Sequence, residues 1–150
     1  MTELLVAFRD WFGGEDPSAG EMRRSVDRLV ADPATEYLLG AADATSSAVG
    51  VVQLRYRHSV WTSRDDAWLE DLYVRDSARG TGVGRALTEF AFARARERGC
   101  FRIQLDVNRA NAAAKALYES LGFSPVQQAF GDEALYMTRI LQDVRGSAHS

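Results

Sequence analysis

The feature that most constrains the fold is a glycine-rich loop between a strand pattern and a helix pattern. Residues 79–84 read Arg-Gly-Thr-Gly-Val-Gly. They follow an apolar strand pattern over residues 68–74 and precede a helical stripe at Val83, Leu87 and Phe90. Glycines at alternate positions let the backbone curl and remove the Cβ atoms that keep a ligand away. Backbone N–H groups then face one concavity at the positive end of the helix dipole, which predicts a diphosphate site.

Two other glycine-rich nucleotide sites fit this loop poorly. A nucleotide P-loop has four residues between its glycines and then Lys-Ser/Thr, and this loop has neither. A dinucleotide-binding loop has two residues between its second and third glycines, whereas Val83 alone separates Gly82 from Gly84. If only the glycines are considered, the loop could also be a glycine-rich turn that binds no ligand.

Patterns on both sides of the loop predict a mixed α/β chain with one central sheet. Helices are expected over residues 4–12, 18–30, 83–99 and 111–121, with Ser18 and Asn111 at the starts of the second and fourth. Strands are expected over residues 36–42, 49–56, 68–74, 101–107 and 134–141, with a polar loop over 57–66. We expect a single domain over residues 1–142 and a frayed tail over residues 143–150.

Composition excludes several classes of function. The chain has 150 residues, a net charge of −3 and one cysteine, Cys100. The charge argues against a nucleic-acid partner, and one cysteine forms no intrachain disulfide and no thiolate metal cluster. No apolar run is long enough to cross a bilayer, and no secretory signal opens the sequence. We therefore predict a cytoplasmic protein with no metal and no membrane partner.

Two motifs, in order, resemble the cofactor motifs of the GNAT family of N-acetyltransferases. The first is Arg79-x-x-Gly82-x-Gly84, preceded by Leu72-Tyr73-Val74. The second is Asn111-x-x-Ala114-x-x-x-Tyr118, followed by Leu121-Gly122-Phe123. The resemblance covers residues 48–123. It implies an α/β fold with a mixed, mostly antiparallel sheet of about six strands, splayed central strands and helices on both faces.

The resemblance also implies roles for these residues around acetyl-CoA. The splayed strand would lend the pantetheine arm the backbone groups of Leu72, Tyr73 and Val74, and an N–H there would polarise the thioester carbonyl. The pyrophosphate would be held by Arg79, Gly80, Thr81, Gly82, Val83, Gly84 and Arg85. Asn111 and Ala114 would hold the pantetheine or adenine side, and Tyr118 would protonate the departing thiolate.

Simple geometry agrees with the second motif. Asn111, Ala114 and Tyr118 stand at i, i+3 and i+7, so they share one helix face. Asn111 and Tyr118 lie about 10 Å apart along the axis at ~1.5 Å per residue. The alternative for Tyr118 is a core aromatic whose hydroxyl reaches water.

An acetyl transfer also needs a base, because an alkyl amine is mostly ammonium at neutral pH. Glu70 fits this role, and the run Glu70-Asp71-Leu72-Tyr73-Val74 resembles the polyamine and diamine acetyltransferase branch of the family. The alternative is a solvated or salt-bridged Glu70. Further candidates for contacts with the substrate are Asp71, Asp106, His58 and Trp61.

The expected substrate is a primary amine of a small molecule or peptide, and the family resemblance suggests a homodimer. One feature departs from the family, because helix-like sequence stands where a first strand is usual. Three alternatives remain: an enzyme of the same fold with a longer acyl group or another nucleophile, a CoA-binding sensor without turnover, and a fragment of a dinucleotide-binding oxidoreductase. The glycine spacing disfavours the last.

Overall fold

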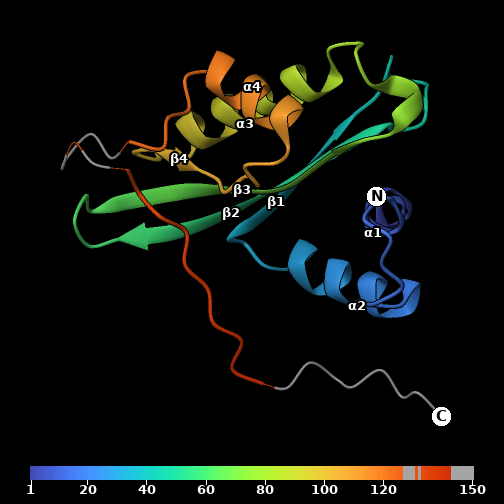
Figure 1. Ribbon diagram of the computed structural model, residues 1–150, viewed down its shortest axis with the longest axis horizontal. Helices are drawn as coiled ribbons and strands as arrows, with labels where there is room; N and C mark the ends of the chain where they lie inside the picture. The colour runs from blue at the N-terminus through green and yellow to red at the C-terminus, as the bar shows by residue number, and fades with distance from the viewer. Residues whose placement is uncertain (127–130, 132, 143–150) are drawn as a thin grey trace. The chain divides into compact units, whose positions relative to one another are not determined.

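The computed structural model describes residues 1–126, 131 and 133–142 (Figure 1). The chain divides into two compact units, residues 1–105 and 106–150, which are described separately. The first unit contains most of the regular structure: α1 (Thr2–Trp11), α2 (Ala19–Val30), β1 (Thr35–Gly40), β2 (Gly50–Ser59), β3 (Arg64–Val74), the 3-10 turn η1 (Asp76–Ala78), α3 (Val83–Glu97) and β4 (Ile103–Gln104). The second contains α4 (Ala112–Ser120). The predicted tail over residues 143–150 lies outside the described residues, and the single domain over 1–142 stays a prediction.

The first unit is built on a four-stranded mixed sheet in the order β1-β2-β3-β4. β1, β2 and β3 are antiparallel neighbours, and β4 pairs with β3 in parallel. β2 and β3 are longer than predicted, so the polar loop expected over residues 57–66 shrinks to a turn over residues 60–63. The mixed α/β class is confirmed, and the described residues form four strands, where about six were expected.

Helices cover both faces of this sheet, as predicted (Figure 1). α3 packs on one face through Leu87, Ala91 and Ala95, against strand residues that include Val52 and Leu54. α1 and α2 pack on the other face, where the buried residues are Leu4, Leu5, Val26, Val51 and Tyr73. Alternate strand residues therefore serve two separate apolar cores.

Close approach of α3 to the sheet depends on a pair of glycines. Gly40 and Gly50 lie opposite each other in β1 and β2. A Cβ at Gly50 would stand 2.9 Å from Leu87 Cδ1 and 3.0 Å from Val83 Cγ1, closer than carbon atoms pack. The missing side chain lets the first turns of α3 lie on the sheet next to the end of β3, and this seats the glycine-rich loop.

Local sequence signals for the helix starts are confirmed. Ser18 Oγ accepts from the backbone N–H of Glu21 and Glu21 Oε2 accepts from Ser18 N, a capping box that opens α2. Asn111 caps α4 through Ala114 N. Residues 1–34 hold two helices and no strand, which agrees with the departure seen in the sequence. No helix among the described residues is long and apolar enough to cross a membrane.

Two strand predictions near the C-terminal end are wrong in extent or in kind. The strand expected over residues 101–107 narrows to the two residues of β4. The strand expected over residues 134–141 is absent from the described part of the second unit, where one bridge joins Val126 to Glu133. Apolar side chains predicted this strand, but Leu135, Met137 and Leu141 are 73–88% exposed, so no packing partner fixes a ladder there.

Candidate active site

The candidate site begins at a β-bulge near the end of β3. Val51 pairs with Tyr73 and Gln53 pairs with Glu70, so Asp71 and Leu72 together oppose the single residue between them on β2. Asp71 takes a left-handed conformation with φ of 52°, which costs a non-glycine residue about 1–2 kcal/mol. Strained backbone of this kind tends to occur at functional sites.

The bulge changes which way the end of the strand faces. Leu69 and Leu72 both pack toward the α3 core, although regular alternation would put them on opposite faces. Tyr73 packs in the α1 core instead, with its ring stacked on Phe8 at a centroid distance of 5.1 Å. The extra residue therefore redirects Leu72 and Tyr73, two residues predicted to lend backbone groups to the pantetheine arm.

β3 also separates from its parallel neighbour before the bulge. The ladder between β3 and β4 consists of Ala67 with Ile103 and Trp68 with Gln104. Within residues 1–105, the rest of β3 has no strand partner on that side. Backbone groups on the β4 side of Leu72–Val74 are therefore placed where a ligand can take the position of a strand.

The glycine-rich loop then leads from β3 into α3. Gly80 and Gly82 have φ of 76° and 89°, values that glycine adopts at little cost. A Cβ on either glycine would meet no atom within 4 Å, so the space beside the loop is open. Glycine is therefore needed at these positions for its backbone conformation and not to avoid a clash. The hydroxyl of Thr81 donates to the carbonyl of Ala78 and closes the turn.

α3 starts without a side-chain cap. Its N-cap is Gly82, and no side chain accepts a hydrogen bond from its first turn. The first N–H groups of a helix have no partner within the helix, and they carry the positive end of its dipole. Val83, Gly84 and Arg85 supply these groups. An uncapped helix start beside open space is suited to a phosphate.

Glu70 lies on the opposite face of the sheet from α3, in a row of polar side chains. Tyr37 on β1 pairs with Gln53 on β2, and Gln53 pairs with Glu70 on β3. Paired residues present their side chains to the same face. Burial raises the pKa of Tyr37, and the negative charges of Asp71 and Glu70 raise it further. The carboxyl predicted as a base thus lies near a half-buried phenol.

Tyr37 and Gln53 were not singled out by sequence reasoning. Gln53 is buried, and its Nε2 has no hydrogen-bond partner among the described residues. Both positions fall in predicted strands, but only the register between strands shows that they stand in line with Glu70. No local motif carries that information.

The structure places His58 and Trp61 at the other end of the β2–β3 hairpin. His58 pairs with Asp65, five positions along β2 from the Gln53–Glu70 pair, which is about 17 Å at ~3.4 Å per residue. Trp61 stands in the turn and is 97% exposed. The structure therefore does not bring these two candidates together with Glu70.

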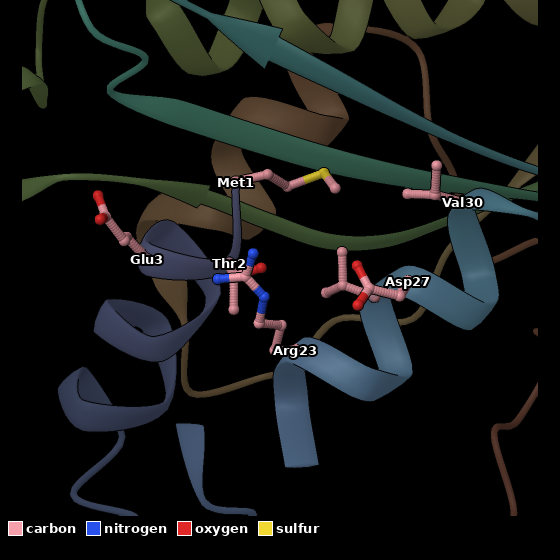
Figure 2. A pocket seen from close by; sticks show the side chains of 7 residues that line it. Met1, Thr2, Glu3, Arg23, Asp27 and Val30 are labelled. Atoms are coloured by element: carbon pink, nitrogen blue, oxygen red, sulfur yellow. The ribbon is translucent and has the colours of Figure 1, made fainter. Parts of the chain in front are cut away.

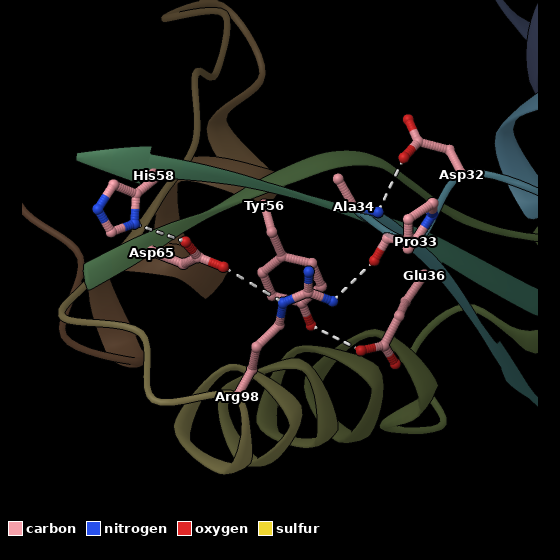
Figure 3. A network of polar contacts seen from close by, with 8 residues as sticks. All are labelled: Asp32, Pro33, Ala34, Glu36, Tyr56, His58, Asp65 and Arg98. Atoms are coloured by element: carbon pink, nitrogen blue, oxygen red, sulfur yellow. Dashed lines mark hydrogen bonds and ion pairs between the residues drawn. The ribbon is translucent and has the colours of Figure 1, made fainter. Parts of the chain in front are cut away.

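His58 belongs to a polar network that ties the hairpin to α3 (Figure 3). Its Nδ1 lies 3.2 Å from Asp65 Oδ1, and Asp65 Oδ2 lies 3.5 Å from Arg98 Nε. Arg98 stacks its guanidinium over the ring of Tyr56 at 4.0 Å, and the hydroxyl of Tyr56 donates to Glu36 at 2.9 Å. These contacts give His58 a structural role.

The second motif lies in the second unit. Asn111 Oδ1 accepts from Ala114 N at 3.2 Å, so this oxygen is used as a helix cap. Tyr118 is 8% exposed, and its ring meets Phe123 edge-on at a centroid distance of 5.6 Å. Burial, with a contribution from the negative charge of Asp106, raises the pKa of Tyr118 to about 12. The hydroxyl is therefore a neutral donor at physiological pH.

A cavity of about 560 Å³ lies between α1 and α2 (Figure 2). Met1, Glu3, Arg23 and Asp27 are among the residues that line it. None of the residues predicted from the sequence for the cofactor or for catalysis lines this cavity.

Comparison with solved structures identifies the class of protein. The chain is similar to the crystal structure of a putative acetyltransferase from Arthrobacter sp. FB24, with a TM-score of 0.82 and 28% sequence identity over 93% of this chain and 87% of that one. The fold is that of an acetyltransferase. Residues 3–123 match the family model described as the Acetyltransferase (GNAT) family. The chain belongs to this family.

Curated relatives have a range of names. A streptothricin acetyltransferase from Streptomyces lavendulae is 34% identical over 90% of this chain and 69% of its own length. A mycothiol acetyltransferase from Beutenbergia cavernae is 45% identical over 45% of this chain. The match spans only 24% of the length of the mycothiol enzyme. The relatives agree on an acetyltransferase and differ in the substrate that their names give.

Proposed function

We propose that this chain is an N-acetyltransferase that transfers the acetyl group of acetyl-CoA to a primary amine of a small molecule or peptide. One observation carries the proposal: the bulged end of β3, which within residues 1–105 has no strand partner on its β4 side, leads through Gly80 and Gly82 into the uncapped start of α3. Membership of the GNAT family and the names of the relatives support the same activity.

The residues present fit acetyl-CoA as the acetyl donor. Open space beside Gly80 and Gly82 admits a diphosphate, and the first-turn N–H groups of α3 face it without a competing cap. Backbone groups of Leu72–Val74 lack a strand partner on the β4 side within the first unit, so they can bind the amide-bearing arm. The bound donor supplies an activated thioester acyl group.

The substrate nitrogen loses two protons in forming the amide: one goes to a protein base, and the other ends on the CoA thiol. Glu70 accepts a proton from the substrate ammonium, which releases the amine as a nucleophile. A backbone N–H of the bulged strand stabilises the negative charge on the carbonyl oxygen. Tyr118 donates to the departing sulfur, and its raised pKa keeps the hydroxyl protonated for this purpose. The family motif, on which Tyr118 stands, supports this role.

Glu70 and Asp71 both raise the pKa of the half-buried Tyr37 and concentrate negative charge at the strand end, so we expect the site to take an amine that is cationic before reaction. We further propose a homodimer in the cytoplasm. Family resemblance supports the dimer, together with the edge strand β1, where Leu39 is 48% exposed. Sedimentation at micromolar concentration tests the assembly.

Release of free thiol on mixing acetyl-CoA with a panel of amines tests the activity. The panel should contain a polyamine, an amino acid, an aminoglycoside and a peptide with a free N-terminus, and mass spectrometry should show an acetylated product. CoA binding without thiol release from any amine would favour a sensor instead. Absence of CoA binding by a folded protein would refute the proposal.

A further inference from the structure

Arg79, at the start of the glycine-rich loop, makes cation–π contacts with two aromatic rings. Its Cζ lies 4.8 Å from the ring centroid of Trp11, the last residue of α1, and 5.9 Å from that of Tyr73. Its Nε donates to the carbonyl of Val74 at 3.1 Å, and its Nη1 lies 2.8 Å from Asp76 Oδ1. The guanidinium is therefore fixed from α1, from β3 and from η1.

This arrangement leaves most of the hydrogen-bonding capacity of Arg79 unused. A guanidinium has five N–H groups. The Val74 carbonyl takes the one on Nε, and Asp76 takes one on Nη1. The other N–H of Nη1 and both on Nη2 have no partner among the described residues. Three donors on two adjacent nitrogens suit a phosphate, which guanidinium binds in a bidentate manner.

Aromatic rings hold a cation without using its donors. A carboxylate partner would compete with phosphate for the same N–H groups, whereas the face of an indole attracts the guanidinium through its quadrupole. Trp11 and Tyr73 therefore add to the hold that the Val74 carbonyl and Asp76 have on Arg79, without using the three N–H groups that remain for an anion. Because an unrestrained arginine loses rotamer freedom on binding, a pre-positioned one binds more tightly.

We infer that Trp11 is a positioning residue for the diphosphate of acetyl-CoA, acting through Arg79. This inference rests on the proposed function. Packing of α1 does not explain the contact, because α1 is anchored by Leu4 and Leu5, and Trp11 is 47% exposed. Its neighbour Phe12 is 69% exposed and contacts Phe8 and Trp11, but it makes no cation–π contact with Arg79.

A double-mutant cycle on Trp11 and Arg79 tests this coupling, with the dissociation constant of CoA measured by calorimetry. Trp11→Leu should raise that constant about 2- to 5-fold, the range set by exposed cation–π contacts. Trp11→Tyr keeps a ring face and should stay within about twofold of the wild type. In an Arg79→Ala background, Trp11→Leu should have no effect. With acetyl-CoA as substrate, KM should rise in Trp11→Leu while kcat is unchanged.

Phe12→Leu is the matched control, since it removes an adjacent exposed ring and should leave CoA affinity unchanged. If Trp11→Leu melts without cooperativity, Trp11→Met carries the same test. Unchanged or tighter CoA binding by a folded Trp11→Leu or Trp11→Met variant would overturn the inference, as would an equal loss in the Arg79→Ala background. Failure of the wild-type protein to bind CoA would instead refute the proposed function itself.

Discussion

Replacing Tyr118 by phenylalanine separates a chemical role of its hydroxyl from a packing role of its ring. The ring is 8% exposed and packs edge-on against Phe123, and phenylalanine keeps this contact. No hydrogen bond to the hydroxyl is found among the described residues. Removing the hydroxyl should therefore change the free energy of unfolding by less than about 1 kcal/mol.

The effect on catalysis follows from the acidity of the hydroxyl. The pKa of Tyr118 is about 12 because the side chain is buried and Asp106 is negatively charged. An alkyl thiol such as cysteine has a pKa near 8.5, about 3.5 units below the pKa of Tyr118. Complete proton transfer from Tyr118 to the sulfur is therefore unfavourable. The hydroxyl acts best by donating a hydrogen bond to the forming thiolate. Hydrogen bonds to charged groups contribute about 1.5–3 kcal/mol, so kcat should fall roughly 10- to 100-fold in Tyr118→Phe.

Three measurements decide this prediction: kcat from thiol release at saturating amine, the acetyl-CoA dissociation constant by calorimetry, and the melting temperature. Tyr136→Phe is the matched control, because Tyr136 is 70% exposed in the same unit and has no proposed role. A Tyr118→Phe enzyme that keeps more than half its kcat and its melting temperature would show that the hydroxyl is not catalytic. A large fall in melting temperature would favour the core-aromatic alternative.

Three further predictions concern the first unit. Glu70→Gln should lower kcat/KM most at the acidic end of a pH–rate profile, where least amine is neutral, and an unchanged profile would leave Glu70 a structural role. Gly82→Ala should weaken CoA binding in calorimetry because φ is 89°, whereas Gly13→Ala, with φ of 74°, carries similar strain outside the loop and should bind normally. Burial of Glu36 opposes its ionisation, but hydrogen bonds from Arg94 and a tyrosine hydroxyl hold its pKa below 4.5. The wild type should therefore be more stable than Glu36→Gln by a constant amount above about pH 4.5, and this difference should shrink as pH falls through the lower pKa of folded Glu36. Denaturant melts at several pH values measure the difference. A difference that widens in acid would contradict the prediction.

Local chemistry made much of this fold predictable from sequence. The Ser18–Glu21 capping box, the Asn111 cap and the apolar stripe of α3 are each encoded within a few residues, and each was found. The strand over residues 134–141 was predicted from apolar composition, but a strand also needs a neighbour, which lies elsewhere in the chain or in another chain.

The candidate site was predictable where it depends on glycine and not where it depends on register. Glycine often adopts a left-handed backbone, so the sequence suggests this conformation at Gly80 and Gly82. Asp71 has a positive φ as well, although its residue type does not predict it. A strand read by strict alternation would send Leu69 and Leu72 to opposite faces, yet the bulge brings them to one. Glu70 faces the α1 side in line with Gln53 by regular alternation, and the bulge directly after it redirects the backbone that leads to the glycine-rich loop. A single extra residue in β3 thus connects the proposed base to the proposed donor site, and only the pairing with β2 makes it visible.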